Sequence, residues 1–274
     1  MSYYSALDLK KEPFSNSPDP EFFYESNEHK AALTRVLIEI RLRRGLSVIL
    51  GDVGVGKTTL SRKLFQVLKE RPDMLFYMIM DPTAQSEELF LESLVRTFNI
   101  QDQIHGSSSI LDYKEAIKKH LYQKGVEENK TIVLVVDEAQ KLNADSLEIL
   151  RVLLNYETNE FKLLQLVLFS QMELLPRIKE IKNFFDRIVL KYVINPLDEP
   201  ETRDLISFRL KKSGFNAELK LFTDEAFNEI QHYSQGYPRR INLICHNALR
   251  SLITSNKTLI DGTLIRDLIA KSLV

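Results

Sequence analysis

The chain has 274 residues, 44% of them hydrophobic, and its 37 Lys and Arg nearly balance its 38 Asp and Glu. This composition is sufficient for a buried core. A formal net charge of −1 gives no overall positive potential that would attract a polyanion, so any surface that binds nucleic acid has to be a local basic patch. The single cysteine excludes a disulfide framework and a four-thiolate zinc site, and no apolar run reaches the ~18 residues of a membrane span, which predicts a soluble protein of a reducing compartment.

The first 26 residues are rich in aromatic and turn-forming residues, among them Phe14, Phe22 and Tyr24. Disordered segments are poor in aromatic residues, so we expect an irregular segment that packs on the body of the protein. The apolar spacing that follows predicts a helix from about Glu28 to Arg44, which Gly45 ends.

Strands and helices are then predicted to alternate. Apolar runs predict five strands, at Leu46–Leu50, Leu75–Met80, Ile132–Val136, Leu163–Phe169 and Ile188–Ile194. Helical patterns lie between them, at about Thr58–Glu70, Ser86–Phe98, Leu111–Gln123 and Asp145–Asn155. Four of the strands are almost continuously apolar, as strands covered on both faces are, whereas Lys191 interrupts the last one and indicates a position nearer an edge. The alternation predicts an α/β fold with a parallel sheet and right-handed crossovers.

The strand pattern stops after Asn195-Pro196. Only helices are predicted beyond it, at about Glu201–Ser213, Thr223–Ser234, Arg239–Thr254 and Gly262–Ser272. We therefore expect an α/β domain of residues 1–197, which includes the aromatic segment, and a helical domain of residues 198–274. Cys245 lies in an apolar helical stretch and is predicted to be a core thiol.

A glycine-rich motif follows the first predicted strand and precedes a predicted helix. It fits G-x-x-x-x-G-K-[ST] with the residues Gly51, Asp52, Val53, Gly54, Val55, Gly56, Lys57, Thr58 and Thr59. Its glycines let main-chain N–H groups turn toward phosphate oxygens, and the helix N-terminus adds its positive dipole end. Lys57 would reach the β- and γ-phosphates, and Thr58 would place its hydroxyl on Mg²⁺. The motif predicts a Mg-ATP site rather than a simple glycine turn.

Polar residues also follow the third and fourth predicted strands. Asp137 and Glu138 end the third strand, where Asp137 would hold the magnesium shell through water and Glu138 would polarise the attacking water. Ser170 and Gln171 end the fourth strand, where a polar tip could sense the γ-phosphate and orient the water. Each pair alone also fits a strand that meets solvent, and the phosphate loop upstream favours the catalytic interpretation.

Two arginines are further candidates. Arg239 follows Pro238, which favours a helix start, so its cation would oppose the helix dipole unless an anion such as the γ-phosphate lay nearby. Arg187 directly precedes the fifth predicted strand. The alternative for both is an exposed arginine in an ion pair.

With these residues identified, the chain resembles the ExeA/GspA family of AAA+ ATPases, first associated with bacterial general secretion. The resemblance covers nearly the whole length. It rests on Pro13-Phe14, Pro18-Asp19-Pro20, Phe22-Phe23-Tyr24, residues 51–60, Asp137-Glu138-Ala139-Gln140, residues 155–158, 162–165 and 171–174, Arg187-Ile188 and residues 236–242. The phosphate loop is shared widely, and the other segments make the resemblance specific.

The resemblance implies a P-loop NTPase core, an αβα sandwich with a five-stranded parallel sheet, followed by a small helical lid, with ATP and Mg²⁺ between them. It implies that Arg239 is the sensor arginine of the lid and Arg187 a finger for a neighbouring subunit, hence a ring or an ATP-dependent oligomer. Arg177 and Arg203 remain alternatives for the finger. Family members often drive assembly of an envelope secretion complex, which implies an unidentified protein partner and a cytoplasmic protein held at the inner membrane through it.

We therefore expect an AAA+ ATPase that hydrolyses Mg-ATP to drive conformational change or assembly of a partner complex, in an envelope or secretion system. A DNA-associated regulator of transposition is the alternative, and the near-neutral charge weakly disfavours it. A nucleotide-binding scaffold with little hydrolysis is a third possibility, against which Lys57, Asp137 and Glu138 argue.

Overall fold

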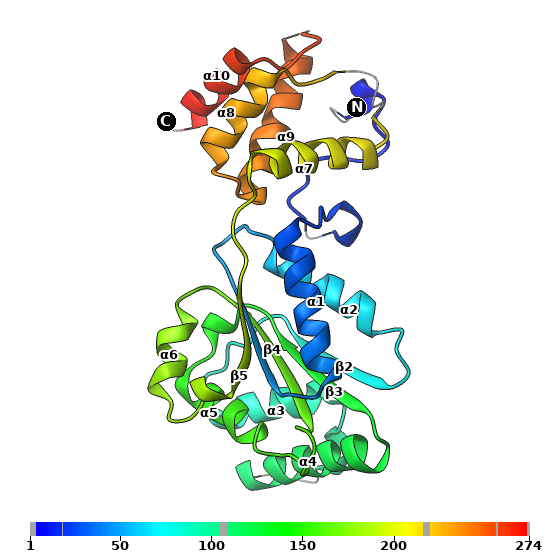
Figure 1. Ribbon diagram of the computed structural model, residues 1–274, viewed down its shortest axis with the longest axis vertical. Helices are drawn as coiled ribbons and strands as arrows, with labels where there is room; N and C mark the ends of the chain where they lie inside the picture. Colours follow the sequence, from blue (N-terminus) through cyan, green and yellow to red (C-terminus); the bar gives the residue numbers. More distant parts are fainter. Residues whose placement is uncertain (1–3, 18, 105–108, 216–219, 256, 273–274) are drawn as a thin grey trace. The chain divides into compact units, whose positions relative to one another are not determined.

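The structure is a computed structural model that describes residues 4–17, 19–104, 109–215, 220–255 and 257–272 (Figure 1). The chain divides into two compact units. The sheet unit consists of His29–Asp52 and Leu60–Ile194. The helical unit consists of the described residues within Met1–Glu28, Val53–Thr59 and Asn195–Val274.

Parallel strands form the centre of the sheet unit. Among the described residues there are five, β1 (Leu46–Leu50), β2 (Met74–Ile79), β3 (Thr131–Val136), β4 (Leu164–Ser170) and β5 (Ile188–Val193). Their order is β2-β3-β4-β1-β5. All five predicted strands are confirmed, with ends that differ by no more than one residue. In the register, Leu50 pairs with both Ser170 and Val193, so β1, β4 and β5 end at one edge of the sheet.

Helices cover both faces of this sheet. They are α1 (Asn27–Arg41), α2 (Lys57–Leu68), α3 (Glu87–Thr97), α4 (Ile110–Tyr122), α5 (Ala144–Leu153) and α6 (Leu174–Glu180). The crossover from β1 to β2 runs along the sheet in the direction opposite to the later crossovers. Because each crossover is right-handed, α2 lies on one face and α3 to α6 on the other. The second face buries an apolar cluster in which Phe90, Leu150 and Ile178 pack against Leu134 and Leu166.

Three details of the sheet unit differ from the sequence prediction. Helix α1 ends at Arg41 rather than near Arg44, because Arg43 and Gly45 adopt left-handed backbone conformations, with φ of 51° and 102°. Helix α6 was not predicted, since it has only seven residues and contains Pro176. Strand β5 is an edge strand as predicted, but the apolar strand β2 is the other edge and is only half-buried.

The helical unit contains α7 (Glu199–Lys212), α8 (Asp224–Ser234), α9 (Pro238–Thr254) and α10 (Gly262–Ser272). The predicted helices of this region are therefore confirmed. Ile206, Ile230, Leu249 and Ile265 are fully buried in its apolar core. Cys245 is fully buried among them, as the prediction of a core thiol requires.

The aromatic N-terminal segment packs in the helical unit, whereas the sequence analysis placed it with the α/β domain. Phe14 is buried in the core formed by α7 to α10. Arg209 of α7 donates Nη1 hydrogen bonds to the carbonyl oxygens of Pro13 (3.1 Å) and Ser15 (3.0 Å). Its guanidinium carbon lies 5.9 Å from the ring centre of Phe22. Local periodicity gives no information on which body an irregular segment packs against, so this contact could not be predicted.

No helix in the described part of the chain has both the length and the apolar character that crossing a bilayer requires.

Candidate functional site

The polar residues selected from the sequence follow the carboxyl ends of neighbouring strands in the sheet unit. The segments after β1 and β4 leave toward opposite faces of the sheet, an arrangement that opens a ligand crevice in α/β proteins. The N–H group of Gly51 donates to the carbonyl oxygen of Ser170 (3.2 Å). The N–H group of Asp137 donates to the carbonyl oxygen of Ile79 (2.8 Å). These bonds fix the first residues beyond β1 and β3.

The loop before α2 has the backbone conformation that its glycines predict. Gly54 and Gly56 have φ of 90° and 102°, in the left-handed region that favours glycine. Helix α2 begins at Lys57, so Thr58 and Thr59 lie in its first turn, where main-chain N–H groups lack helical partners. Such a turn favours an anion through these N–H groups and the helix dipole. The loop can therefore bind a phosphate.

Asp137 is buried, and both of its carboxylate oxygens accept hydrogen bonds. Oδ1 accepts the N–H of Glu138 (3.0 Å), and Oδ2 accepts the hydroxyl of Ser61 (3.3 Å). Ser61 lies one helical turn after Lys57, on the same side of α2. The sequence analysis missed Ser61, although its i, i+4 spacing from Lys57 was a usable signal. The hydroxyl joins the start of α2 to the end of β3.

Gln140 brings Glu138 together with Ser170 and Gln171. Its Nε2 donates to Glu138 Oε2 (2.7 Å), and its Oε1 accepts the Ser170 hydroxyl and the Gln171 N–H, both at 3.2 Å. Three of the predicted site residues thus meet at one amide. The sequence analysis assigned no role to Gln140.

Magnesium would need ligands from the nucleotide in addition to protein oxygens. The described residues contain no group of three or more His, Cys, Asp or Glu side chains that could hold a metal ion. Mg²⁺ usually binds one or two carboxylates, substrate phosphates and several waters. The hydroxyl of Thr58 and the carboxylate of Asp137 are oxygen donors of this kind.

All three arginines considered as fingers donate hydrogen bonds within the chain. Arg177 donates Nη1 to the carbonyl oxygen of Gln140 (2.6 Å) and Nη2 to that of Leu142. Arg203 binds Asp224 (2.7 Å) and Asn228 (3.0 Å), and it also pairs with Glu199. Neither guanidinium could act elsewhere without breaking these bonds.

Arg187 lies at the amino edge of the sheet, opposite the edge that carries Gly51. Ile188, the first residue of β5, pairs with Leu46, the first residue of β1, whereas Gly51 follows the last. Five strand residues separate the two edges by roughly 16 Å at ~3.3 Å per residue. Arg187 donates only to main-chain carbonyls among the bonds seen here, Asn183 O (3.2 Å) and Leu154 O (3.4 Å).

Arg239 lies in the first turn of α9, after Pro238, as predicted. Its main-chain N–H donates to the carbonyl oxygen of Gly54 (3.3 Å). A Cβ on Gly54 would lie 3.0 Å from the Cβ of Arg239. Within the helical unit, the start of α9 therefore lies against the phosphate-loop residues, and the side chain of Arg239 is exposed.

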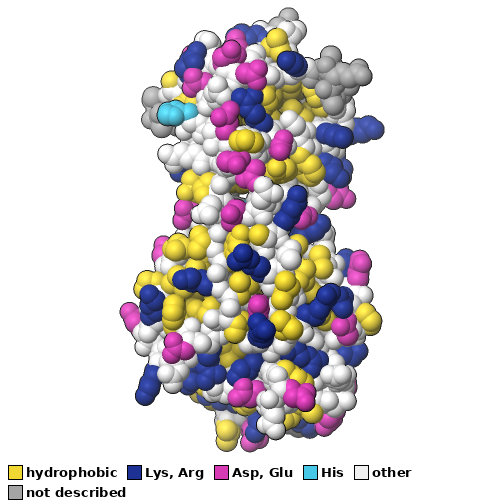
Figure 2. All heavy atoms as spheres, in the orientation of Figure 1, with side chains coloured by type: hydrophobic (Ala, Val, Ile, Leu, Met, Phe, Trp, Pro, Cys, Tyr) yellow, Lys and Arg dark blue, Asp and Glu magenta, His cyan; other side chains and the backbone are white. Residues whose placement is uncertain are grey.

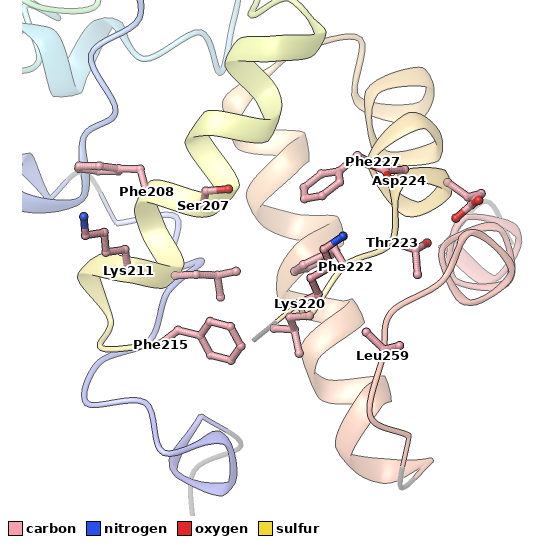
Figure 3. A pocket seen from close by; sticks show the side chains of 13 residues that line it. Ser207, Phe208, Lys211, Phe215, Lys220, Phe222, Thr223, Asp224, Phe227 and Leu259 are labelled. Atoms are coloured by element: carbon pink, nitrogen blue, oxygen red, sulfur yellow. The ribbon is translucent and has the colours of Figure 1, made fainter. Parts of the chain in front are cut away.

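A cavity of about 570 Å³ lies elsewhere in the helical unit (Figure 3). Aromatic rings from α7, α8 and the segments beside them line it, including Phe208, Phe215, Phe222 and Phe227. Lys211, Lys220, Asp224 and Glu225 also line it. None of the predicted site residues lines this cavity, and its charges of both signs indicate no preference for a ligand of one charge.

Comparison with protein families agrees with this geometry. Residues 40–178 match a family described as an AAA domain. The chain is 34% identical over 250 residues to general secretion pathway protein A of Aeromonas hydrophila, a match that covers 90% of this chain and 44% of that protein. The chain thus spans less than half the length of this relative.

More distant similarities also extend over most of the chain. An uncharacterized HTH-type transcriptional regulator of Methanocaldococcus jannaschii is 23% identical over 95% of this chain and 72% of its own length. The ORC2 protein of Aeropyrum pernix, solved in ADPNP–ADP complexes, superposes with a TM-score of 0.66 at 19% identity, over 96% of this chain and 71% of that one.

Proposed function

Because the chain belongs to the family of AAA domains, we propose that it binds Mg-ATP with residues 51–59 and hydrolyses ATP with Glu138 as general base. P-loop proteins of this fold bind nucleotide, generally with Mg²⁺, and ATPase activity is general among them. The main observation behind this proposal is the conformation of the loop. Gly54 and Gly56 have left-handed backbone conformations and come just before a helix that begins at Lys57. Ser61 supports it by joining this helix to Asp137.

Each residue of the proposed site has its own role in binding ATP or in its hydrolysis. The main-chain N–H groups of the loop and the Lys57 ammonium bind the phosphates, while the Thr58 hydroxyl and, through water, Asp137 hold Mg²⁺. When bound, Mg²⁺ would supply positive charge that offsets the charge on the phosphate oxygens. Glu138 accepts a proton from water as the water oxygen bonds to the γ-phosphorus and the bond to the bridging oxygen breaks, which yields ADP and phosphate. Gln171 and Ser170 orient the water.

Arginines complete the proposed site. Arg239 acts as the sensor for the γ-phosphate, supported by its place in a first helical turn beside Gly54. Arg187 acts on the nucleotide of a neighbouring subunit, supported by its position at the sheet edge opposite Gly51. This role requires an oligomer, such as a ring.

The biological role that we propose is ATP-driven assembly of an envelope or secretion complex with a protein partner, at the cytoplasmic face of the inner membrane. It is supported by the similarity to general secretion pathway protein A. Regulation on DNA is the second candidate, supported by the weaker similarity to a transcriptional regulator. Basic, acidic and apolar side chains are interspersed on the face that Figure 2 shows, which favours the first candidate.

Nucleotide binding by Lys57 is tested by thermal unfolding with and without Mg-ATP. At a ligand concentration 100 times Kd, the wild-type protein should gain about 2.7 kcal/mol of unfolding free energy. Lys57→Ala should gain no unfolding free energy from Mg-ATP relative to the same variant without nucleotide, because the phosphates lose their cation. Lys63→Ala, which removes a lysine later in the same helix, should respond like wild type. A Lys57→Ala protein that keeps the full gain would contradict the phosphate-loop assignment.

A further inference from the structure

The side chain of Gln140 has only one orientation that satisfies its partners. A carboxylate accepts hydrogen bonds and a main-chain N–H donates them. The Nε2 group must therefore face Glu138 (2.7 Å), and Oε1 must face the Gln171 N–H and the Ser170 hydroxyl (both 3.2 Å). One amide thus connects Glu138, the proposed general base that follows β3, with Ser170 and Gln171 at the tip of β4.

The main chain around Gln140 is fixed as well. Arg177 donates Nη1 to the carbonyl oxygen of Gln140 (2.6 Å). The N–H of Lys141 donates to the carbonyl oxygen of Glu138 (2.9 Å), which closes a tight turn around the buried Ala139. Glu138 itself has a φ of 51°, an uncommon left-handed conformation for this residue type. The turn therefore directs the amide of Gln140 back onto the carboxylate of the residue two positions before it.

We propose that Gln140 is a positioning residue, which holds the Glu138 carboxylate for proton abstraction and couples it to the tip of β4. This inference rests on the proposed ATP hydrolysis. A charge-assisted hydrogen bond to one carboxylate oxygen orients the other toward the attacking water. Ser170 and Gln171 orient the attacking water in the proposed mechanism, and they share Oε1 of the same amide. A shift of the β4 tip therefore changes the position of Glu138, so the base is aligned only when the tip is in place.

The first test replaces Gln140 with methionine, which has similar length and cannot donate to Glu138. With the full-length protein, kcat for ATP should fall about 10- to 100-fold, while KM and the thermal stabilisation by Mg-ATP stay within about twofold of wild type. Gln66→Met, the same change at an exposed position of α2, should leave all three unchanged. Wild-type kcat in Gln140→Met would overturn the proposal.

Gln140→Glu separates positioning from structural support. A carboxylate at 140 still accepts from Ser170 and Gln171, but at pH 8 it repels Glu138 instead of holding it. We expect intact folding and ATP binding with a kcat at least as low as that of Gln140→Met. If both variants lose stability and ATP binding together, Gln140 has only a structural role and the proposal is wrong.

The coupling is tested by adding Ser170→Ala. If Ser170 acts on Glu138 through Gln140, Ser170→Ala should lower kcat in the wild-type background and have little effect in Gln140→Met. Additive effects would overturn the coupling. Glu138→Gln is measured in parallel, because a Glu138→Gln protein with wild-type turnover refutes the proposed base, whereas an inactive Glu138→Gln with a fully active Gln140→Met refutes only the role of Gln140.

Discussion

At the residue scale, Gly236 shows how a single position can determine the start of a helix that carries a site residue. Its φ is 76°, and a Cβ built on it would lie 1.9 Å from the carbonyl oxygen of Leu197. The N–H of Leu197 in turn donates to the carbonyl oxygen of Gly236 (2.9 Å). The close contact between Gly236 and Leu197 therefore lies two residues before Pro238, the first residue of α9. Arg239 is the second residue of this helix.

Gly236→Ala should therefore be strongly destabilising. The methyl group would meet main-chain atoms that cannot move aside, so we expect a loss of more than about 2 kcal/mol of unfolding free energy, measured by urea denaturation. Gly214→Ala is the matched control, because Gly214 also has a positive φ of 94° but its Cβ would meet only the flexible side chain of Lys10 at 3.3 Å. The control should lose about 1 kcal/mol. Equal losses would show that the close approach at Gly236 is unimportant.

Which site residues could be predicted depended on whether their signal is local. Gly51 and the acids Asp137 and Glu138 directly follow predicted strands, so motif and strand pattern together predicted that they lie at one sheet edge. The contact of Gln140 with Ser170 joins residues 30 positions apart, one in the turn after β3 and the other at the end of β4. No local pattern contains such a pair, and only the folded sheet brings it together.

At the element scale, strand positions were predictable and their environments less so. The run of apolar residues located β2 to within one residue, yet it suggested full burial where the strand is a half-buried edge. Aromatic packing accounts for the apolar composition, since Phe76 contacts Phe65 of α2 (5.0 Å between ring centres) and Tyr77 contacts Phe98 (4.9 Å). An edge strand that packs against aromatic side chains and a central strand that is buried between helices both appear in the sequence as a continuous apolar run.

The contact between α4 and β2 should make the stability of the sheet unit depend on pH. His120 of α4 is buried, its Nε2 lies 3.2 Å from the Tyr77 hydroxyl, and its ring stacks on Phe98 (5.6 Å). Burial lowers the pKa of His120 below 6.5, Lys124 lowers it further, and Glu128 partly opposes them. Below pH 6.5 the unfolded chain therefore binds the proton more readily than the folded one, so the free energy of unfolding should fall as the pH decreases.

His120→Phe tests this dependence, because it keeps an aromatic ring and removes the titrating group. Urea denaturation of both proteins between pH 5 and pH 7 should show that the difference in stability, wild type minus variant, decreases toward low pH. The same pH slope in both proteins would mean that His120 does not contribute to the acid sensitivity.

At the scale of the whole molecule, the alternation of strands and helices predicted the fold class. It did not predict whether copies of the chain assemble into an oligomer. A ring or filament depends on complementary surfaces, which composition and periodicity do not reveal. The position of Arg187 provides the structural argument for assembly, since it lies at the amino edge of the sheet and Gly51 at the carboxyl edge. A finger at this position would act on the nucleotide of another copy of the chain.

Mixing two inactive variants tests whether Arg187 acts between subunits. Arg187→Ala should bind ATP normally and lose hydrolysis, since an arginine supplied in trans contributes about 10³–10⁵-fold in known phosphoryl-transfer systems. Lys57→Ala should be inactive for lack of nucleotide. In mixed oligomers an intact Lys57 site can meet an intact Arg187, so ATPase activity should partly return. If the variants co-assemble and no activity returns, Arg187 acts within its own subunit or has no catalytic role.

The most direct test of the central claim, ATP hydrolysis with Glu138 as base, is the rate of phosphate release by Glu138→Gln at saturating Mg-ATP. The amide retains the shape of the side chain but cannot accept the proton. We expect Mg-ATP to stabilise Glu138→Gln as much as wild type, while kcat of the variant falls by roughly 10²–10⁴-fold. A kcat within about twofold of wild type would contradict the account and place the catalytic base elsewhere.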